Sequence, residues 1–494
     1  MAGGGVPSVQ QTREFWTAAG LSLFAALVFG FTTKDTMHDF DYTVRIASAL
    51  LDGHLGLERS PGSWLNEMVP FEGKYYSVFP LGAVLSMMPV ALLQRLGWIH
   101  IFLGRLVTAF IAGLCVFFFF RLSIAETKSI GRRILLALFP IFATWTWCNL
   151  GFGGSWQIAL GFALLGQIGA LYFTLVQRRP LVGGAFFALA FGNRTELIIT
   201  LPIYLYLLCR ASYGEDHPRV PHEGPVSSDA RARDEQATIA DSDDPIHVRQ
   251  IVAEPPSNAV GSALSLVTLA QATPDDIPAL SGSMAALEQP IVAQRHSSRL
   301  GKLAQRLQQN WPAFASFVIV PALLALLTAA YNFARFHSFF DFGYTRIPGV
   351  LNEPWYQHGL FSLHAIQGNL YHMLFKGLGD TIPKFPYIQP YGFGCSIFLA
   401  SPFLFLLFRE GGGYTRAAWI AIGMLTAVLW THGNPGGWQF SYRYATILLP
   451  WMFLLITGNG PARLSLMEIS LFAVSVVVNA LATYEFLWTK SIHP

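Results

Sequence analysis

Long apolar blocks dominate this 494-residue sequence and decide its class. Each block runs for about 17 to 24 residues, which at ~1.5 Å per residue is long enough to cross roughly 30 Å of hydrocarbon. Only 12% of the residues are charged, about half the share found in soluble domains. Aromatic residues near the block ends suit the membrane interface. The sequence therefore predicts an all-α polytopic membrane protein.

The apolar blocks predict ten or eleven crossings. Nine of them are single blocks, at about 15–32, 101–120, 134–149, 156–176, 314–333, 392–408, 416–431, 444–458 and 465–485. Segment 181–210 is too long for one upright span and contains the polar break GNRTE at 192–196. We expect two short helices that meet near the outer face, which brings the count to about eleven.

Arg194 and Glu196 lie inside this break. Ionisable groups are energetically costly at bilayer depth, so the two residues mark either a structural ion pair or a site. Because residues two apart point to different sides of a helix, they should not face each other. Ion pairs of Arg194 and of Glu196 with residues elsewhere in the chain explain them at least as well as a functional site does.

Clusters of Lys and Arg in the short loops set the orientation. They occur at 121–133, 178–179 and 409–416, and we place these loops in the cytoplasm. Three other stretches are then outside: 33–99, 334–391 and 431–443. Within the first outer loop, DYTVRIASALLDG and PLGAVLSMMPVALLQRLG predict helices that lie at the membrane surface.

The same pattern divides the chain into three parts. An N-terminal membrane module covers 1–209 and carries the first outer loop, and a C-terminal membrane module covers 311–494 and carries the outer loop 334–391. The segment 210–310 between them is rich in charge, Pro, Ser and Asp and has few aromatic residues. Such a segment cannot bury enough apolar surface to fold alone, so we expect a disordered cytoplasmic insertion.

The first outer loop is unusually acidic. Its carboxylates are Asp35, Asp39, Asp41, Asp52, Glu58, Glu67 and Glu72. In an extended turn, Asp39 and Asp41 would face one site or share a divalent cation such as Mg²⁺ or Mn²⁺, whereas in a helix they diverge. A solvated loop without chemistry is the alternative for any one of these acids.

Three stretches carry a resemblance to a known family. One is HDFDYTVRIASALLDG with the following GKYYSVFPLGAVLSMMP and GRLVTAF; the others are YNFARFHSFFDFGYT and GGWQFSYRYATILLP. They resemble the GT-C glycosyltransferases, membrane enzymes that take sugars from polyprenyl-phosphate carriers, and in particular the branch of protein mannosyltransferases and aminoarabinose transferases. The family's first loop often holds adjacent Asp-Glu or a single Asp, whereas this chain has Asp-Phe-Asp.

The resemblance and the chemistry together suggest site residues. Sugar transfer needs a base for the acceptor hydroxyl, and Asp41 or Asp39 is our candidate. The departing phosphate needs cations, preferably Arg with its two-pronged fork. Candidates for this role are Arg335, Arg443, Arg105, Arg346 and Lys74; for Arg443 an ordinary interfacial position is the alternative. Candidates for contact with the acceptor or sugar are Glu67, Tyr75, Tyr76 and Tyr344.

The resulting hypothesis is an inverting glycosyltransferase of a GT-C-like bundle, in the inner membrane of a bacterium, with its site on the outer face. Its partners would be a polyprenyl-phosphate sugar donor, the bilayer, and a glycan, lipid or protein acceptor. No metal site is assigned, because a monophosphate donor needs little charge neutralisation and the histidines lack ligand spacing. A net charge of +3 gives no reason to expect nucleic acid. The alternatives are a flippase or transporter, and a ligase or polymerase of lipid-linked glycans.

Overall fold

The computed structural model describes residues 9–34, 39–62, 67–212, 289–489 and 492, and these are mostly helical. Within them, five helices contain an apolar stretch long enough to cross a membrane. They are α1 (Val9–Thr32), α5 (Gly104–Leu122), α8 (Ser155–Leu175), α12 (Gln289–Phe336) and α17 (Leu466–Leu487). The fold is therefore that of a mostly helical, membrane-embedded protein. Residues 1–216 and 307–494 belong to one compact unit.

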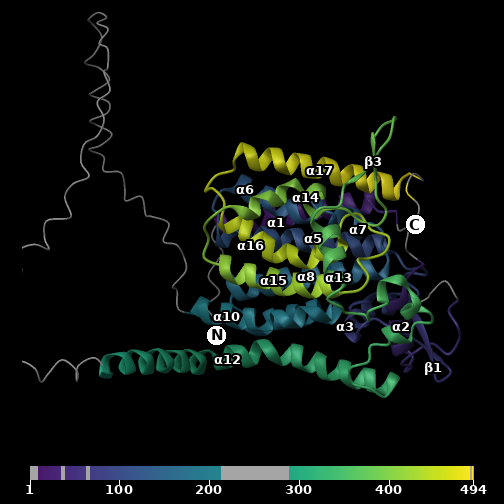
Figure 1. The fold of residues 1–494 in the computed structure, drawn as a ribbon, viewed down its shortest axis with the longest axis horizontal. Coiled ribbons are helices and arrows are strands. Elements are labelled where there is room, and N and C mark those ends of the chain that lie inside the picture. The colour runs from purple at the N-terminus through teal and green to yellow at the C-terminus, as the bar shows by residue number, and fades with distance from the viewer. Residues whose placement is uncertain (1–8, 35–38, 63–66, 213–288, 490–491, 493–494) are drawn as a thin grey trace, which may run out of the picture. The chain divides into compact units, whose positions relative to one another are not determined.

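Shorter apolar helices fill the unit between the long ones (Figure 1). They are α6 (Ile130–Phe142), α7 (Thr146–Leu150), α9 (Pro180–Asn193), η2 (Thr195–Thr200), α10 (Leu201–Ser212), α14 (Ile397–Ala400), η6 (Pro402–Phe408), α15 (Thr415–Thr431), η7 (Arg443–Leu448) and α16 (Leu449–Gly458). The segment expected as one span over 134–149 is thus two helices, α6 and α7. The expected break in 181–210 falls at Arg194, where the backbone is extended between α9 and η2.

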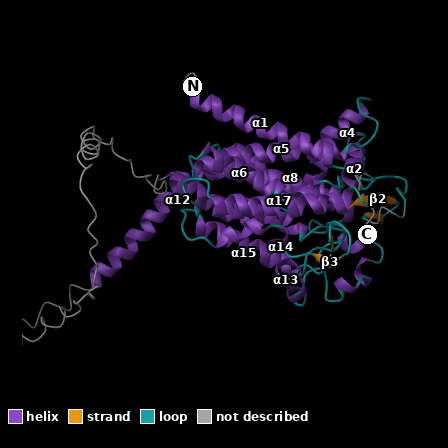
Figure 2. Ribbon diagram, turned by 90° about the horizontal axis from the view of Figure 1, so that it is seen from above, coloured by secondary structure: helices purple, strands orange, loops and turns teal. Residues whose placement is uncertain are grey.

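Two groups of short elements lie together at one end of the long helices (Figure 2). The first outer loop forms α2 (Tyr42–Leu51), the hairpin β1 (Met68–Phe71) and β2 (Lys74–Ser77), α3 (Leu81–Ser86) and α4 (Met88–Arg95). The stretch after α12 forms η3 (Tyr344–Arg346), η4 (Val350–Asn352), η5 (Pro354–Tyr356), α13 (Ala365–Leu374), β3 (Gly379–Thr381) and β4 (Ile388–Pro390). The sequence predicted helices at 42–51 and 81–95 but not the hairpin.

The predicted insertion over 210–310 is described only at its edges. Helix α10 ends at Ser212, and α12 begins at Gln289, well before the expected end of the insertion. Residues 213–288 lie outside the described part of the chain. Helix α12 thus continues without a break from the last part of the predicted insertion into the apolar stretch that follows.

Small residues let the central helices approach one another closely. Helix α8 is almost completely buried, and its Gly166 and Gly169 leave room for the backbone and side chains of α9. On α9, a Cβ at Gly184 would collide with the carbonyl group of Phe317 on α12. Contacts of this kind are a usual basis of helix association in membranes, where apolar burial gives little driving force.

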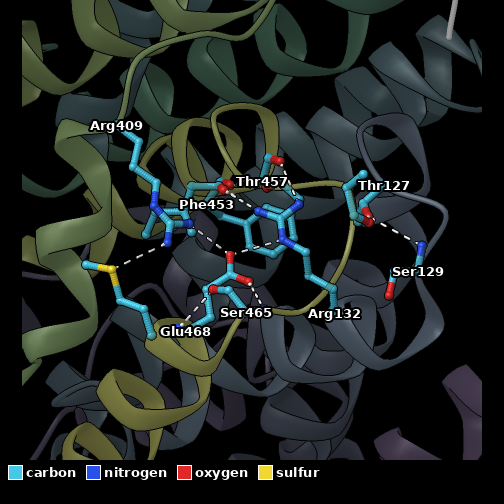
Figure 3. Close-up of polar contacts among 11 residues, drawn as sticks. Thr127, Ser129, Arg132, Arg409, Phe453, Thr457, Ser465 and Glu468 are labelled. Carbon is cyan, nitrogen blue, oxygen red and sulfur yellow. Dashed lines mark hydrogen bonds and ion pairs between the residues drawn. The ribbon is translucent and has the colours of Figure 1, made fainter. Parts of the chain in front are cut away.

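A buried ionic network holds the opposite end of the bundle together (Figure 3). One carboxylate oxygen of Glu468 accepts from Arg132 Nε at 3.1 Å and from Arg409 Nη1 at 3.0 Å. Arg132 also donates to the backbone oxygens of Ile456 and Thr457 at 2.8 and 3.1 Å. The network joins α6, η6, α16 and α17, and every member has partners, so we assign it a structural role.

Candidate active site

The first outer loop is fixed to the start of α8. The backbone N–H of Ser155 donates to the carbonyl oxygen of Phe40 at 3.0 Å, and the hydroxyl groups of Ser155 and Thr43 lie 3.2 Å apart. The next residue, Trp156, packs against the rings of Phe40 and Tyr42, with centroid distances of 5.1 and 5.2 Å. These contacts place residues 40–43 beside the indole of Trp156.

Glu67 is the acid of this loop with the most unusual environment. Its carboxylate accepts a hydrogen bond from Trp156 Nε1 at 2.5 Å. Burial raises the pKa of Glu67 to about 7, although the Trp156 hydrogen bond and the positive charge of Arg443 both lower it. Near neutral pH, Glu67 is therefore present in both protonation states, and its proton can be donated to an oxygen of a bound molecule.

Two arginines lie against the ring of Tyr444. The guanidinium carbon of Arg194 is 4.9 Å from the ring centre, and that of Arg443 is 5.1 Å from it. Arg194 is held by Glu196, with Nη2 and Nε at 2.7 and 2.8 Å from the same carboxylate oxygen. The expectation that these two residues pair elsewhere is wrong, because Arg194 is extended between α9 and η2, so the geometry of a continuous helix, on which the expectation rested, does not hold here.

Arg443 has unused hydrogen-bonding capacity. Its side chain is largely buried, and its bonds to the carbonyl oxygen of Trp438 and to the Tyr444 hydroxyl are long, at 3.5 and 3.4 Å. Its Nε is buried and, among the described residues, has no acceptor. A buried donor without an acceptor is costly, so this group is suited to an anionic ligand.

Tyrosines and a histidine complete the surroundings. The hydroxyl groups of Tyr344 and Tyr356 lie 2.9 Å apart, and burial raises the pKa of both phenols, that of Tyr356 to about 12. The ring of His432 lies 5.9 Å from that of Tyr444 and 6.3 Å from that of Tyr356. Burial lowers the pKa of His432, as do the charges of Arg194 and Arg443, whereas a hydrogen bond to the backbone of Asn434 and the charge of Glu196 raise it.

Asp41 occupies the N-cap position of α2, although its side chain makes no capping hydrogen bond there. Its carboxylate accepts from Arg45 Nε at 2.6 Å, which fixes the orientation of the carboxylate. Burial raises the pKa of Asp41, while Arg45 lowers it and nearby Asp39 raises it. Asp39 itself is exposed. Within the described residues, no group of three or more His, Cys, Asp or Glu side chains is placed to hold a metal ion.

The other predicted cations lie in different surroundings. Arg335 is buried at the end of α12, where it donates to Ser77 O at 2.6 Å and to Asn332 Oδ1 at 2.7 Å. Arg346 is paired with Asp341 at 2.7 Å and lies over the ring of Phe71. These contacts fasten the loop after α12 to the β1–β2 hairpin.

The hairpin and α5 carry the remaining predicted residues. Tyr76 is buried and packs on Phe336 with a centroid distance of 5.6 Å. Tyr75 exchanges backbone hydrogen bonds with Leu57 at 2.8 and 2.9 Å, and Lys74 pairs with Phe71 at the hairpin turn. Arg105 is exposed in the first turn of α5. Of the predicted residues, the structure thus brings together Glu67, Arg443 and Tyr344, with Asp41 adjacent through Tyr42 and Trp156.

Four further residues of this site were not among the predicted site residues: Trp156, Tyr356, His432 and Tyr444. The pair of Arg with Tyr in GGWQFSYRYATILLP was a local signal for Tyr444. Arg194 was noticed as an intramembrane charge, but its neighbour Tyr444 lies 250 positions away in the chain. Comparison of the chain with protein-family models, curated proteins and solved structures finds no match.

Proposed function

We propose that this chain is a GT-C-like glycosyltransferase of a bacterial inner membrane that moves one sugar from a polyprenyl phosphate to an acceptor on the outer face. The five long helices and the shorter apolar helices are in keeping with about eleven crossings. The position of both large loops at one end of the bundle (Figure 2) supports a shared site for donor and acceptor. The resemblance of three sequence stretches to GT-C enzymes supports the chemistry.

The observation that carries the proposal is the order of charged groups along the site. Phe40 and Tyr42 flank Asp41 and pack on Trp156, which binds Glu67. Glu67 in turn lies close enough to Arg443 for the positive charge to lower its pKa. A base, a hydrogen-bonding acid and a phosphate-binding cation therefore follow one another, an order that suits attack of a hydroxyl group and departure of a phosphate.

The proposed step is a direct displacement. The acceptor hydroxyl, on a glycan, lipid or protein, gives its proton to Asp41 as its oxygen bonds to the anomeric carbon. The bond from that carbon to the phosphate oxygen breaks, and the phosphate leaves with the electron pair. Arg443 and Arg194 stabilise the charge that develops on the phosphate. Glu67 and Tyr344 bind sugar hydroxyl groups.

The test is sugar transfer by the purified full chain in lipid nanodiscs, with a radiolabelled polyprenyl-phosphate sugar as donor. Asp41→Asn should lower kcat by roughly 10²–10⁴-fold, the usual effect of losing a general base. Asp52→Asn is the matched control, because Asp52 belongs to the same loop but is 60% exposed and paired with Arg95. Full activity of Asp41→Asn would contradict the role of Asp41. Movement of the labelled lipid across the bilayer without any new glycosidic product would support a flippase instead.

A further inference from the structure

The hairpin of β3 and β4 stands out from the bundle. Figure 1 shows it projecting beyond α17, at the end where that helix stops and across the direction of α17 rather than along it. Its turn is closed by two backbone hydrogen bonds, from Tyr387 N to Lys384 O at 2.8 Å and from Ile382 N to Tyr387 O at 3.0 Å. The strands approach so closely that a Cβ at Gly379 would collide with the carbonyl oxygen of Gln389. A well-formed backbone therefore holds the tip away from the bundle.

The tip of this hairpin presents aromatic side chains to the surroundings. Phe385 and Tyr387 are 70% and 61% exposed, and their rings lie edge to face with a centroid distance of 6.2 Å. Lys384 is exposed beside them, and residues 381–389 contain no Asp or Glu. Exposed apolar side chains that gather in one place mark surfaces that bind a protein or a membrane. The tip thus combines an apolar end with one positive charge and no negative charge.

The base of the hairpin lies level with the end of α17. The ring of Phe393, just after β4, is 6.4 Å from that of Trp438, which is 5.1 Å from Phe486 in the last turn of α17. The ring of Trp488, directly after α17, has the Lys34 ammonium 3.9 Å from its centre. Trp and Lys side chains at the ends of spanning helices are typical of the membrane interface. The hairpin therefore begins at the depth of the lipid headgroups and runs sideways at that depth.

We propose that the tip of the β3–β4 hairpin binds the outer surface of the bilayer, with the rings of Phe385 and Tyr387 among the lipid headgroups and Lys384 on the aqueous side. Aromatic rings favour this depth, and the Tyr387 hydroxyl keeps its contact with water there. The level of the hairpin favours lipid over a soluble protein as the occupant. The contact would hold the loop 334–391 at a constant height above the membrane. It goes beyond the proposed function, because it holds for any activity of this bundle.

The depth of the tip is tested with a nitrobenzoxadiazole fluorophore on Phe385→Cys, in the full chain in phosphatidylcholine nanodiscs. The background is Cys209→Ala, since the other native cysteines are buried. Lipids that carry a nitroxide on the upper part of an acyl chain should lower the fluorescence, and iodide in the water should have little effect. Glu58→Cys is the control, because Glu58 is an exposed acid of the first outer loop, and its label should respond in the opposite way.

Two outcomes of this measurement would overturn the inference. Strong quenching by iodide without quenching by the nitroxide lipid would place the tip in water. Weak quenching by both agents would mean that protein, and not lipid, covers the tip, as in contact with a second copy of the chain.

A label outside the tip tests the aromatic side chains themselves. With the fluorophore on Thr381→Cys, which is exposed in β3, a nitroxide on the lipid headgroup should quench while the native tip is present. The double substitution Phe385→Ser and Tyr387→Ser should reduce this quenching, because Ser has almost no apolar area to place in lipid. The bonds of the turn come from backbone atoms, so the hairpin should persist, and thermal unfolding shows whether the bundle is folded. Equal quenching with both tips would overturn the inference.

Discussion

The protonation state of Glu67 gives the site a pH dependence that can be measured at the scale of one residue. Burial raises the pKa of Glu67 to about 7, so the folded protein binds a proton that the unfolded chain loses at lower pH. Stability should therefore increase as the pH falls from about 8 to about 6. Thermal unfolding in detergent at the two pH values measures this difference.

Glu67→Gln is the matched variant, because Gln keeps the shape of the acid without its titration. The difference in melting temperature between the two pH values should become smaller in this variant. If protonated Glu67 donates a hydrogen bond to a sugar hydroxyl oxygen, kcat/KM of the unaltered protein should also fall as the pH rises through about 7. The Gln variant should lack this decline. A Gln variant that keeps the full pH dependence of stability would show that another group is responsible.

At the scale of elements, the network around Glu468 should matter more for stability than any exposed ion pair. Arg132 and Glu468 are both almost completely buried, with side chains 1% and 0% exposed. Glu468→Ala would leave Arg132 buried without its counter-charge and would remove the N-terminal capping box of α17. Breaking a buried pair in this way costs about 3–5 kcal/mol.

Denaturation of the purified protein in mixed micelles measures this change in the free energy of unfolding. Asp52→Ala serves as the control, since the Asp52–Arg95 pair is more than half exposed and such pairs contribute about 1 kcal/mol or less. Similar losses of stability in both variants would mean that the Glu468 network is weaker than its burial implies.

Hydropathy predicted the long helices, and helical spacing predicted α2, because these patterns are local. The β1–β2 hairpin was not predicted. In the structure its turn is formed by Glu72 and Gly73, which both have positive φ, as is usual in two-residue hairpin turns. The Glu-Gly pair is a weaker turn signal than Asn-Gly, and the flanking strands have only four residues each.

At the scale of the whole molecule, the sequence indicated the outer loops that carry the candidate site. It did not indicate which residues of these loops contact one another. Glu67 and Arg443 were both predicted, since an acid in an outer loop and an Arg beginning a span are local features. Their convergence with Arg194 and Tyr444 depends on how α9, η2 and η7 pack, and no local pattern encodes it. Arg335, the predicted cation at the end of α12, instead donates to the carbonyl group of Ser77.

The orientation of the whole molecule in the membrane can be measured by labelling from one side. The loops 33–99 and 334–391 lie at one end of the bundle (Figure 2), and the network of Arg132, Arg409 and Glu468 joins the loops expected in the cytoplasm. Cysteines introduced at Glu58 and Lys384 should therefore react with a membrane-impermeant maleimide in intact cells. Cysteines at Arg178 and Glu410 should react only after lysis, because Lys- and Arg-rich loops stay in the cytoplasm.

The native cysteines set the background of this experiment. Cys115, Cys148 and Cys395 are buried and Cys209 is partly buried, so the unaltered protein should label weakly, and a variant with Cys209→Ala removes most of the remainder. Opposite labelling of Glu58→Cys and Lys384→Cys would place the two large loops on different sides of the membrane. The donor and acceptor could then not meet at a site built from both loops, and the proposed function would fail together with the topology.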